Sequence, residues 1–154
     1  MDAADQLTIL GRAALAALLG FAIGLEREYR GKVAGERTFA LLALGAASFT
    51  GAGALLLGPD GAGRVIQGVV AGMGFLGAGV IFRRRELDVR GLTTAASAWA
   101  AAAIGVVVGL GAYLAGALST ALVLLILELG QIPLLRRVHE RGAPVDDREP
   151  GSDG

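Results

Sequence analysis

The chain has no cysteine and only one histidine, His139, among its 154 residues. Without cysteine it can form no disulfide bond, carry no thiolate nucleophile and build few of the common structural zinc sites. A single histidine in a charged tail cannot supply a metal cluster or a catalytic triad. We therefore expect a protein that is not an enzyme, with no catalytic residue, no resident metal and no cofactor.

Charge is missing from long parts of the chain, although 18% of all residues are charged. Residues 39–81 carry only Asp60 and Arg64 as charges, and residues 92–132 carry only Glu128. A helix at the surface of a soluble protein needs a charged face, which these stretches do not have. The distribution of charge therefore predicts helices that lie in a lipid bilayer.

Five apolar runs have about 18 to 20 residues each, the length that crosses about 30 Å of hydrocarbon as a helix. They cover residues 7–25, 38–57, 65–82, 92–109 and 113–130. The sequence thus predicts an all-α, polytopic membrane helix bundle with about five transmembrane helices. A count of four would need one long helix through Gly109 and Gly111, where a break is more natural.

Basic residues are concentrated in three places. Twelve of the fourteen Lys and Arg residues lie in residues 26–37, 83–90 and 136–148. By the positive-inside rule these segments face the cytoplasm, so the N-terminus is out and the C-terminus is in. The first run lacks the basic flank of a signal peptide, and we expect it to be retained as a span. We expect residues 1–135 to form the transmembrane domain and residues 136–154 a charged, disordered cytoplasmic tail.

Glycines recur at short spacing within the predicted spans. Small residues allow membrane helices to approach closely, so these positions are candidates for helix packing, either within a tight bundle or in a homo-oligomer. The third span has so many glycines that we expect it at the centre of the bundle. The candidate positions are Gly20, Gly24, Gly68, Gly72, Gly74, Gly77, Gly79, Gly105 and Gly109.

The two charged connections, residues 26–37 and 83–90, contain acidic and basic residues side by side. We expect them to pair into one cytoplasmic cap, with Glu26 and Glu28 facing Arg90 and with Asp88 facing Arg27 or Arg37. Their carboxylates could instead hold a hydrated Mg²⁺, although the net positive charge of both loops argues against this. The arginines could also attract anionic lipid headgroups, or the charges could serve orientation alone.

Threonine follows glycine by three residues where two of the spans begin. Gly35 precedes Thr38, and Gly91 precedes Thr94. Threonine hydroxyls accept hydrogen bonds from the free amides of a first helical turn. The pattern predicts that both threonines are N-caps.

Two long motifs resemble the N-terminal membrane domain of the MgtC/SapB family of bacterial inner-membrane proteins. They are "GLEREYRGKVAGERTFALLALGA", which starts at Gly24, and "GFLGAGVIFRRRELDVRGLTTAASAWAAAAIGVVVGLG", which starts at Gly74. The resemblance implies a multi-pass protein of the inner membrane with an outward N-terminus. Our candidate functional cap comprises Asp88 and eight residues that also carry the resemblance, namely Glu26, Arg27, Arg37, Thr38, Arg90, Thr93, Thr94 and Trp99.

The same resemblance implies a function. Members of the family are associated with growth under magnesium limitation and, in pathogens, with virulence and survival inside macrophages. We therefore expect a regulator that contacts other inner-membrane proteins, with the ATP synthase as one implied partner, besides membrane lipid and further copies of the chain. Nucleic acid is not an expected partner. The alternative hypothesis is a transporter or channel for a small ion such as Mg²⁺.

The sequence departs from the family pattern in two places. Family members carry a cytoplasmic ACT-like domain after the last span, whereas residues 136–154 contain too few apolar residues to bury a core. Glu36 stands where the resemblance leads us to expect leucine before the Arg37–Thr38 pair.

Overall fold

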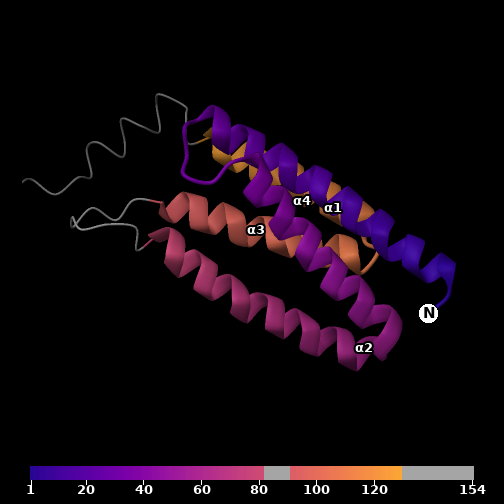
Figure 1. Ribbon diagram of the computed structural model, residues 1–154. Helices are drawn as coiled ribbons and strands as arrows, with labels where there is room; N and C mark the ends of the chain where they lie inside the picture. Colours follow the sequence, from indigo (N-terminus) through magenta and orange to yellow (C-terminus); the bar gives the residue numbers. More distant parts are fainter. Residues whose placement is uncertain (82–90, 130–154) are drawn as a thin grey trace, which may run out of the picture. The chain divides into compact units, whose positions relative to one another are not determined.

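The computed structural model describes residues 1–81 and 91–129, and the described residues form four helices and no strand. The helices are α1 (Ala3–Tyr29), α2 (Glu36–Ile81), α3 (Leu92–Gly109) and α4 (Tyr113–Leu129) (Figure 1). The prediction of an all-α membrane protein is confirmed at this level, because α1, α2 and α3 are long and apolar enough to cross a membrane. Residues 1–124 form one compact unit, and the contacts below lie within it.

Helix α1 extends beyond the predicted span at both ends. At its start Asp2 and Asp5 form a capping box, in which the carboxylate of Asp2 accepts the amide of Asp5 at 2.8 Å and the carboxylate of Asp5 accepts the amide of Asp2 at 3.3 Å. At its other end α1 continues through the charged residues Glu26, Arg27 and Glu28 and ends at Tyr29. The apolar run therefore marks the membrane part of a longer helix.

Helix α2 contains 46 residues but is folded back on itself at Gly58 (Figure 1). The backbone there has φ +67° and ψ −170°, a combination that is essentially restricted to glycine, and Pro59 supplies no amide to continue the preceding helix. Residues 36–57 and 59–81 thus form two arms of a hairpin. The predicted connection between the second and third spans is found at this bend, but only one of its residues, Gly58, has non-helical dihedral angles.

The first arm of α2 lies between α1 and α3. A Cβ added to Gly20 of α1 would lie 2.8 Å from the Cβ of Ala43, and one added to Gly105 of α3 would lie 2.9 Å from the Cβ of Ala46. Ala43 and Ala47 have no exposed surface. The small residues of this arm therefore allow both α1 and α3 to approach it closely.

The predicted central position of the third span is wrong. The second arm of α2 lies at the edge of the unit, beside α3 and the first arm (Figure 1). An added Cβ at Gly68, Gly72 or Gly74 would meet nothing within 4 Å, and the side chain of Phe75 is 83% exposed. Alanine-rich faces, rather than the highest glycine content, mark the centre of this bundle.

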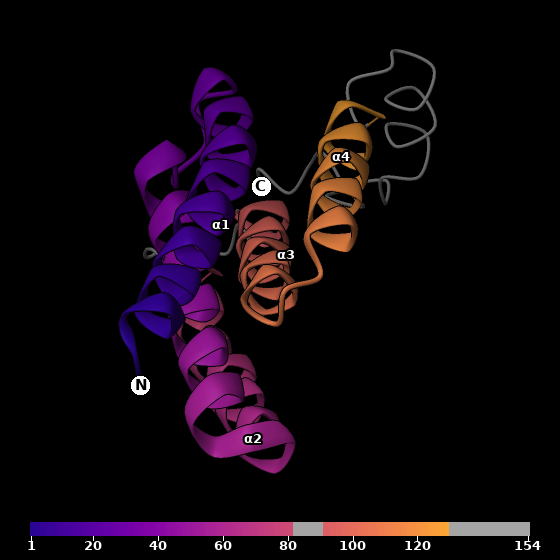
Figure 2. The ribbon, with the colours of Figure 1, turned by 90° about the vertical axis from the view of Figure 1, so that its right-hand side faces the viewer.

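The start of α4 packs beside α3 (Figure 2). A Cβ on Gly116 would contact side-chain carbons of Val108 and would lie 3.7 Å from Leu19 of α1. The chain turns between α3 and α4 at Gly111, which has φ +93°. This left-handed conformation favours glycine, so the predicted break between the last two spans occurs at a residue suited to it.

Arg12 bonds across the helices near this turn. Its Nη1 donates to the carbonyl oxygen of Gly109 at 2.8 Å, and its Nε donates to the hydroxyl of Tyr113 at 3.2 Å. The last carbonyls of a helix are unpaired and carry partial negative charge, so the guanidinium stabilises the C-terminus of α3. Arg12 thus ties α1 to both helices that flank the turn.

Candidate functional site

Charged and polar residues gather where α1 ends and where α2 and α3 begin. Gly31, Lys32 and Val33 of the α1–α2 connection line a cavity of about 400 Å³ together with residues 91–94 of α3. Residues 26–38 and 91–94 therefore lie at one end of the unit. We call this set the charged cap.

A glycine ends α1 and fixes the direction of the connection. The amide of Gly31 donates to the carbonyl of Glu28 at 2.8 Å, and the amide of Lys32 donates to the carbonyl of Arg27 at 3.0 Å. Gly31 has φ +63°. These are the two hydrogen bonds of a Schellman motif, which satisfies the last carbonyls of α1 and sets the direction of the chain within the charged cap.

Arg27 is the most unusual residue of the cap, because its side chain is only 2% exposed. Its Nε pairs with the carboxylate of Glu26, which is itself 10% exposed. The Nε of Arg30 lies 3.4 Å from the other oxygen of the same carboxylate. Glu26 therefore joins two arginines one turn apart, and the charge of the buried guanidinium has a partner.

Glu28 and Glu36 form an acidic pair across the connection, outside the apolar stretches. A hydrogen bond between their side chains, together with the charge of Glu36, raises the pKa of Glu28 above its ordinary value. The same hydrogen bond lowers the pKa of Glu36. The two carboxyl groups therefore share a proton more readily than isolated glutamates do.

The two predicted threonine caps are wrong. The N-cap of α3 is Gly91, with φ +98° and no side-chain hydrogen bond to the first turn, and Thr94 is the third residue of the helix. Thr94 is buried and its carbonyl accepts a hydrogen bond from the hydroxyl of Ser97 at 3.0 Å. Thr38 is likewise the third residue of α2 and is exposed. Helix α2 starts at Glu36, two residues before the predicted apolar run, and α3 starts at Leu92, so both threonines lie inside the first turn rather than before it.

The other candidate residues are distributed differently. Arg37 is in the cap with its side chain 92% exposed, and its Nε lies 3.6 Å from a carboxylate oxygen of Glu36. Thr93 lines the cap cavity, whereas Trp99 lies further along α3, half-exposed beside Val69 and Met73 of the second arm.

Some predictions about the cap fall beyond the described part of the chain. Asp88 and Arg90, and with them the predicted pairs to Glu26, Arg27 and Arg37, lie outside the described residues. Within those residues, no three His, Asp or Glu side chains come together in a way that could hold a metal ion.

The predicted packing glycines fall into two groups. A Cβ on Gly24 would lie 2.9 Å from the amide nitrogen of Glu36, and one on Gly109 would lie 2.7 Å from the carbonyl oxygen of Ala47. With Gly20 and Gly105, these positions bring α1 and α3 against the first arm of α2. The remaining five candidates meet open space, namely Gly68, Gly72, Gly74, Gly77 and Gly79.

Three contact residues were absent from the sequence-based prediction. Gly116 lies four residues before Thr120, and the carbonyl oxygen of Gly116 accepts a hydrogen bond from the Thr120 hydroxyl at 2.9 Å. Small residues at this spacing favour close helix contacts, so sequence reasoning could have found Gly116. Gly31 follows the charged helix end, where glycine is the common stop residue. Tyr113 had no such signal, because its bond to Arg12 joins residues 101 positions apart.

Comparison with known proteins agrees with the two motifs and the helices that carry them. The MgtC family model matches residues 14–134. The chain belongs to the MgtC family. It is 45% identical over 126 residues to Protein MgtC of Salmonella typhimurium, a match that covers 82% of this chain and 52% of the relative.

A second MgtC relative gives a similar result. Protein MgtC of Brucella abortus is 45% identical over 107 residues, which cover 70% of this chain and 44% of that relative. The chain thus spans about half the length of the MgtC proteins that it matches. No solved structure gives a significant match.

Proposed function

We propose that this MgtC-family protein is a multi-pass protein of the bacterial inner membrane that regulates other membrane proteins by direct contact during magnesium limitation. In this proposal α1, the two arms of α2, α3 and α4 supply five crossings, and the charged cap faces the cytoplasm. The excess of basic residues in the connections supports this orientation. The link to magnesium and to virulence in pathogens rests on the family resemblance.

One observation carries the proposal of protein contact. The cap presents Tyr29, which is 86% exposed, and Val33, which is 61% exposed, and it also carries the exposed side chain of Arg37. The Glu26–Arg27 pair and the hydrogen bonds of Gly31 order the backbone beneath them. Aromatic and arginine side chains on an ordered surface are typical anchors of protein interfaces.

Photocrosslinking in native membranes tests this contact. A photoreactive phenylalanine analogue placed at Tyr29 or Val33 is expected to capture a defined membrane protein, which we would identify by mass spectrometry. The matched control places the same analogue at Leu18, which is 66% exposed on the apolar part of α1 and should face lipid. Capture of the same proteins from Leu18 and Tyr29, or of none from either cap position, would contradict the proposal.

The transport alternative is tested separately in liposomes. If the protein acts by contact alone, liposomes that contain the purified full chain should show no more Mg²⁺ or proton flux than empty liposomes. A selective flux above that of empty liposomes would favour transport, and its loss in a Glu26→Ala variant shown to be folded would make the carboxylate of the cap part of an ion path.

A further inference from the structure

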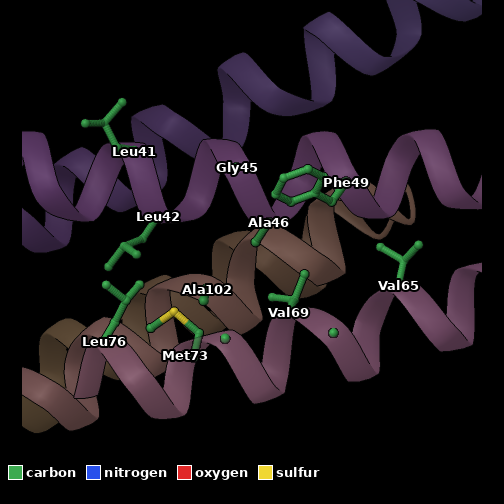
Figure 3. Close-up of a pocket in the computed structure, with 12 residues that line it drawn as sticks. Leu41, Leu42, Gly45, Ala46, Phe49, Val65, Val69, Met73, Leu76 and Ala102 are labelled. Atoms are coloured by element: carbon green, nitrogen blue, oxygen red, sulfur yellow. The ribbon is translucent and has the colours of Figure 1, made fainter. Parts of the chain in front are cut away.

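An apolar groove separates the two arms of α2. Its volume is about 430 Å³, within the range of about 300–1,000 Å³ that is typical of ligand pockets. Leu42 and Ala46 of the first arm point toward Met73 and Leu76 of the second, and Ala102 of α3 lies behind them (Figure 3).

Glycines keep this groove open. Gly45 lies on the first arm, and Gly68 and Gly72 lie on the second, where any side chain would project into the space. An added Cβ at each of these positions would meet nothing within 4 Å. Phe49 and Leu76, at 65% and 53% exposure, border the groove on the side that is open to the surroundings.

The groove requires an apolar occupant when the arms cross a bilayer. Its walls offer almost no hydrogen-bonding group, so water would lose hydrogen bonds by entering it. An empty groove would leave its walls without dispersion contacts. The acyl chains of the surrounding lipid are the apolar groups present in abundance along an open groove between two membrane-crossing arms.

The end of the groove near the charged cap suits a phosphate. Arg37 lies one helical turn before Leu41 and Thr38 one turn before Leu42, and both leucines line the groove. The guanidinium of Arg37 and the hydroxyl of Thr38 are exposed. The first turn of α2 adds the positive end of a helix dipole at the same place. Arg37, Thr38 and the N-terminus of α2 therefore lie about one helical turn from the groove lining, and the 92% exposed side chain of Arg37, although near the carboxylate of Glu36, is accessible to a phosphate.

We propose that the groove between the arms of α2 binds one acyl chain of an anionic phospholipid, with the lipid phosphate at Arg37 and Thr38. A helix from a second copy is the competing occupant. Suppose that two copies pair through this groove with a two-fold axis along the membrane normal. The Arg37 side chains of both copies would then lie at the same depth in the membrane and repel one another. A phosphate at this position is instead attracted. The proposal does not depend on which membrane protein the charged cap contacts.

Native mass spectrometry of the full chain in detergent tests the proposal. Titration with dioleoylphosphatidylglycerol should give one tightly bound lipid per chain, and dioleoylphosphatidylcholine should bind more weakly. The variant Arg37→Gln should weaken phosphatidylglycerol binding about fivefold, the ratio that corresponds to about 1 kcal/mol for one basic side chain at an anionic surface. The matched control Arg64→Gln removes the same charge near the Gly58 bend, far along the chain from the cap, and should leave the affinity unchanged.

A second pair of variants tests the apolar part of the site. Gly68→Leu fills the groove and should abolish the tight binding of both lipids. Gly74→Leu adds the same side chain to the same arm, away from the groove lining, and should retain binding. Circular dichroism and thermal unfolding of both variants establish that they are folded.

Three results would overturn the proposal. The first is that the wild-type chain binds both lipids with equal affinity and that Arg37→Gln leaves this affinity unchanged. The second is equal lipid binding by Gly68→Leu and Gly74→Leu. The third is a dimer of the wild-type chain that Gly68→Leu converts to a monomer, which would assign the groove to a second copy.

Discussion

At the scale of single residues, the buried Arg27 carries the largest energetic consequence in the charged cap. Its side chain is 2% exposed and its Nε pairs with Glu26. Glu26→Ala should lower the free energy of unfolding by about 3–5 kcal/mol, because it removes the carboxylate partner of a buried charge. Unfolding of the purified protein by added denaturing detergent measures this loss.

Two further variants make the Arg27 prediction specific. Glu26→Leu combined with Arg27→Met removes both charges and should recover a large part of the lost stability. Arg37→Ala removes an arginine whose side chain is 92% exposed and should change stability by no more than about 0.5 kcal/mol. Equal losses for Glu26→Ala and Arg37→Ala would show that the burial of Arg27 has no energetic consequence.

The acidic pair of Glu28 and Glu36 predicts a dependence of stability on pH. Because the folded state raises the pKa of Glu28, the contribution of Glu28 is present below the ordinary glutamate pKa and is lost as the pH rises through the raised value. The lowered pKa of Glu36 acts in the opposite direction, since its contribution is lost as the pH falls through the lowered value. Just above pH 4.5, the ordinary pKa of Glu28, the raised pKa of Glu28 therefore has the larger effect, and stability should fall as the pH rises.

Glu28→Gln isolates this effect. The amide donates a hydrogen bond to Glu36 at every pH, so the variant should lose less stability than the wild type when the pH is raised from 4.5 to 7. Thermal unfolding of both proteins in the same detergent gives the comparison, and Glu128→Gln serves as the control for an unrelated carboxylate. Parallel pH profiles for wild type and Glu28→Gln would contradict a shared proton.

At the scale of elements, the hairpin of α2 depends on one glycine. Gly58→Ala should destabilise the protein by about 1–3 kcal/mol, because the backbone conformation at this position is essentially accessible to glycine only. Gly63→Ala is the matched control on the second arm, where an added Cβ meets nothing, and it should be neutral or stabilising. Detergent-induced unfolding compares them, and equal stability of the two variants would show that the bend tolerates a side chain.

Close helix contacts give a second prediction for the elements. Gly105→Ala places a Cβ against the backbone of Ala43 and should cost about 1–3 kcal/mol by overpacking. Gly45→Ala, on the neighbouring helix, adds the same methyl group in open space and should be tolerated. The difference in unfolding free energy between these variants measures how closely α3 approaches α2. If both are tolerated, the close contact is absent in the membrane.

At the scale of the whole molecule, the prediction concerns topology. The chain has no cysteine, so single cysteines can be introduced without altering native ones. Cysteines at Lys32 and Arg64 should react from opposite sides of the membrane with an impermeant maleimide, because one arm of α2 separates these positions. Reaction of both from the same side would rule out a crossing by that arm.

The sequence predicted the helical class and the places where helices break, because apolar length and glycine positions are local properties. It placed the third span wrongly at the centre, since glycine content does not tell which face of a helix is covered. The sequence also did not predict which arginine of the cap is buried. Arg27 and Arg37 flank the same turn, yet one is 2% and the other 92% exposed, and only the packing of distant segments decides this.

The bend at Gly58 also affects how much of the protein can be reached from the side of the membrane on which it lies. A single non-helical residue reverses the chain there, and the turn between α3 and α4 needs only residues 110–112. Proteases cleave exposed, extended backbone, which these two reversals scarcely offer. There the described chain is therefore presented as helix ends, and its longest described connection, residues 30–35, lies at the other end of the unit, in the charged cap.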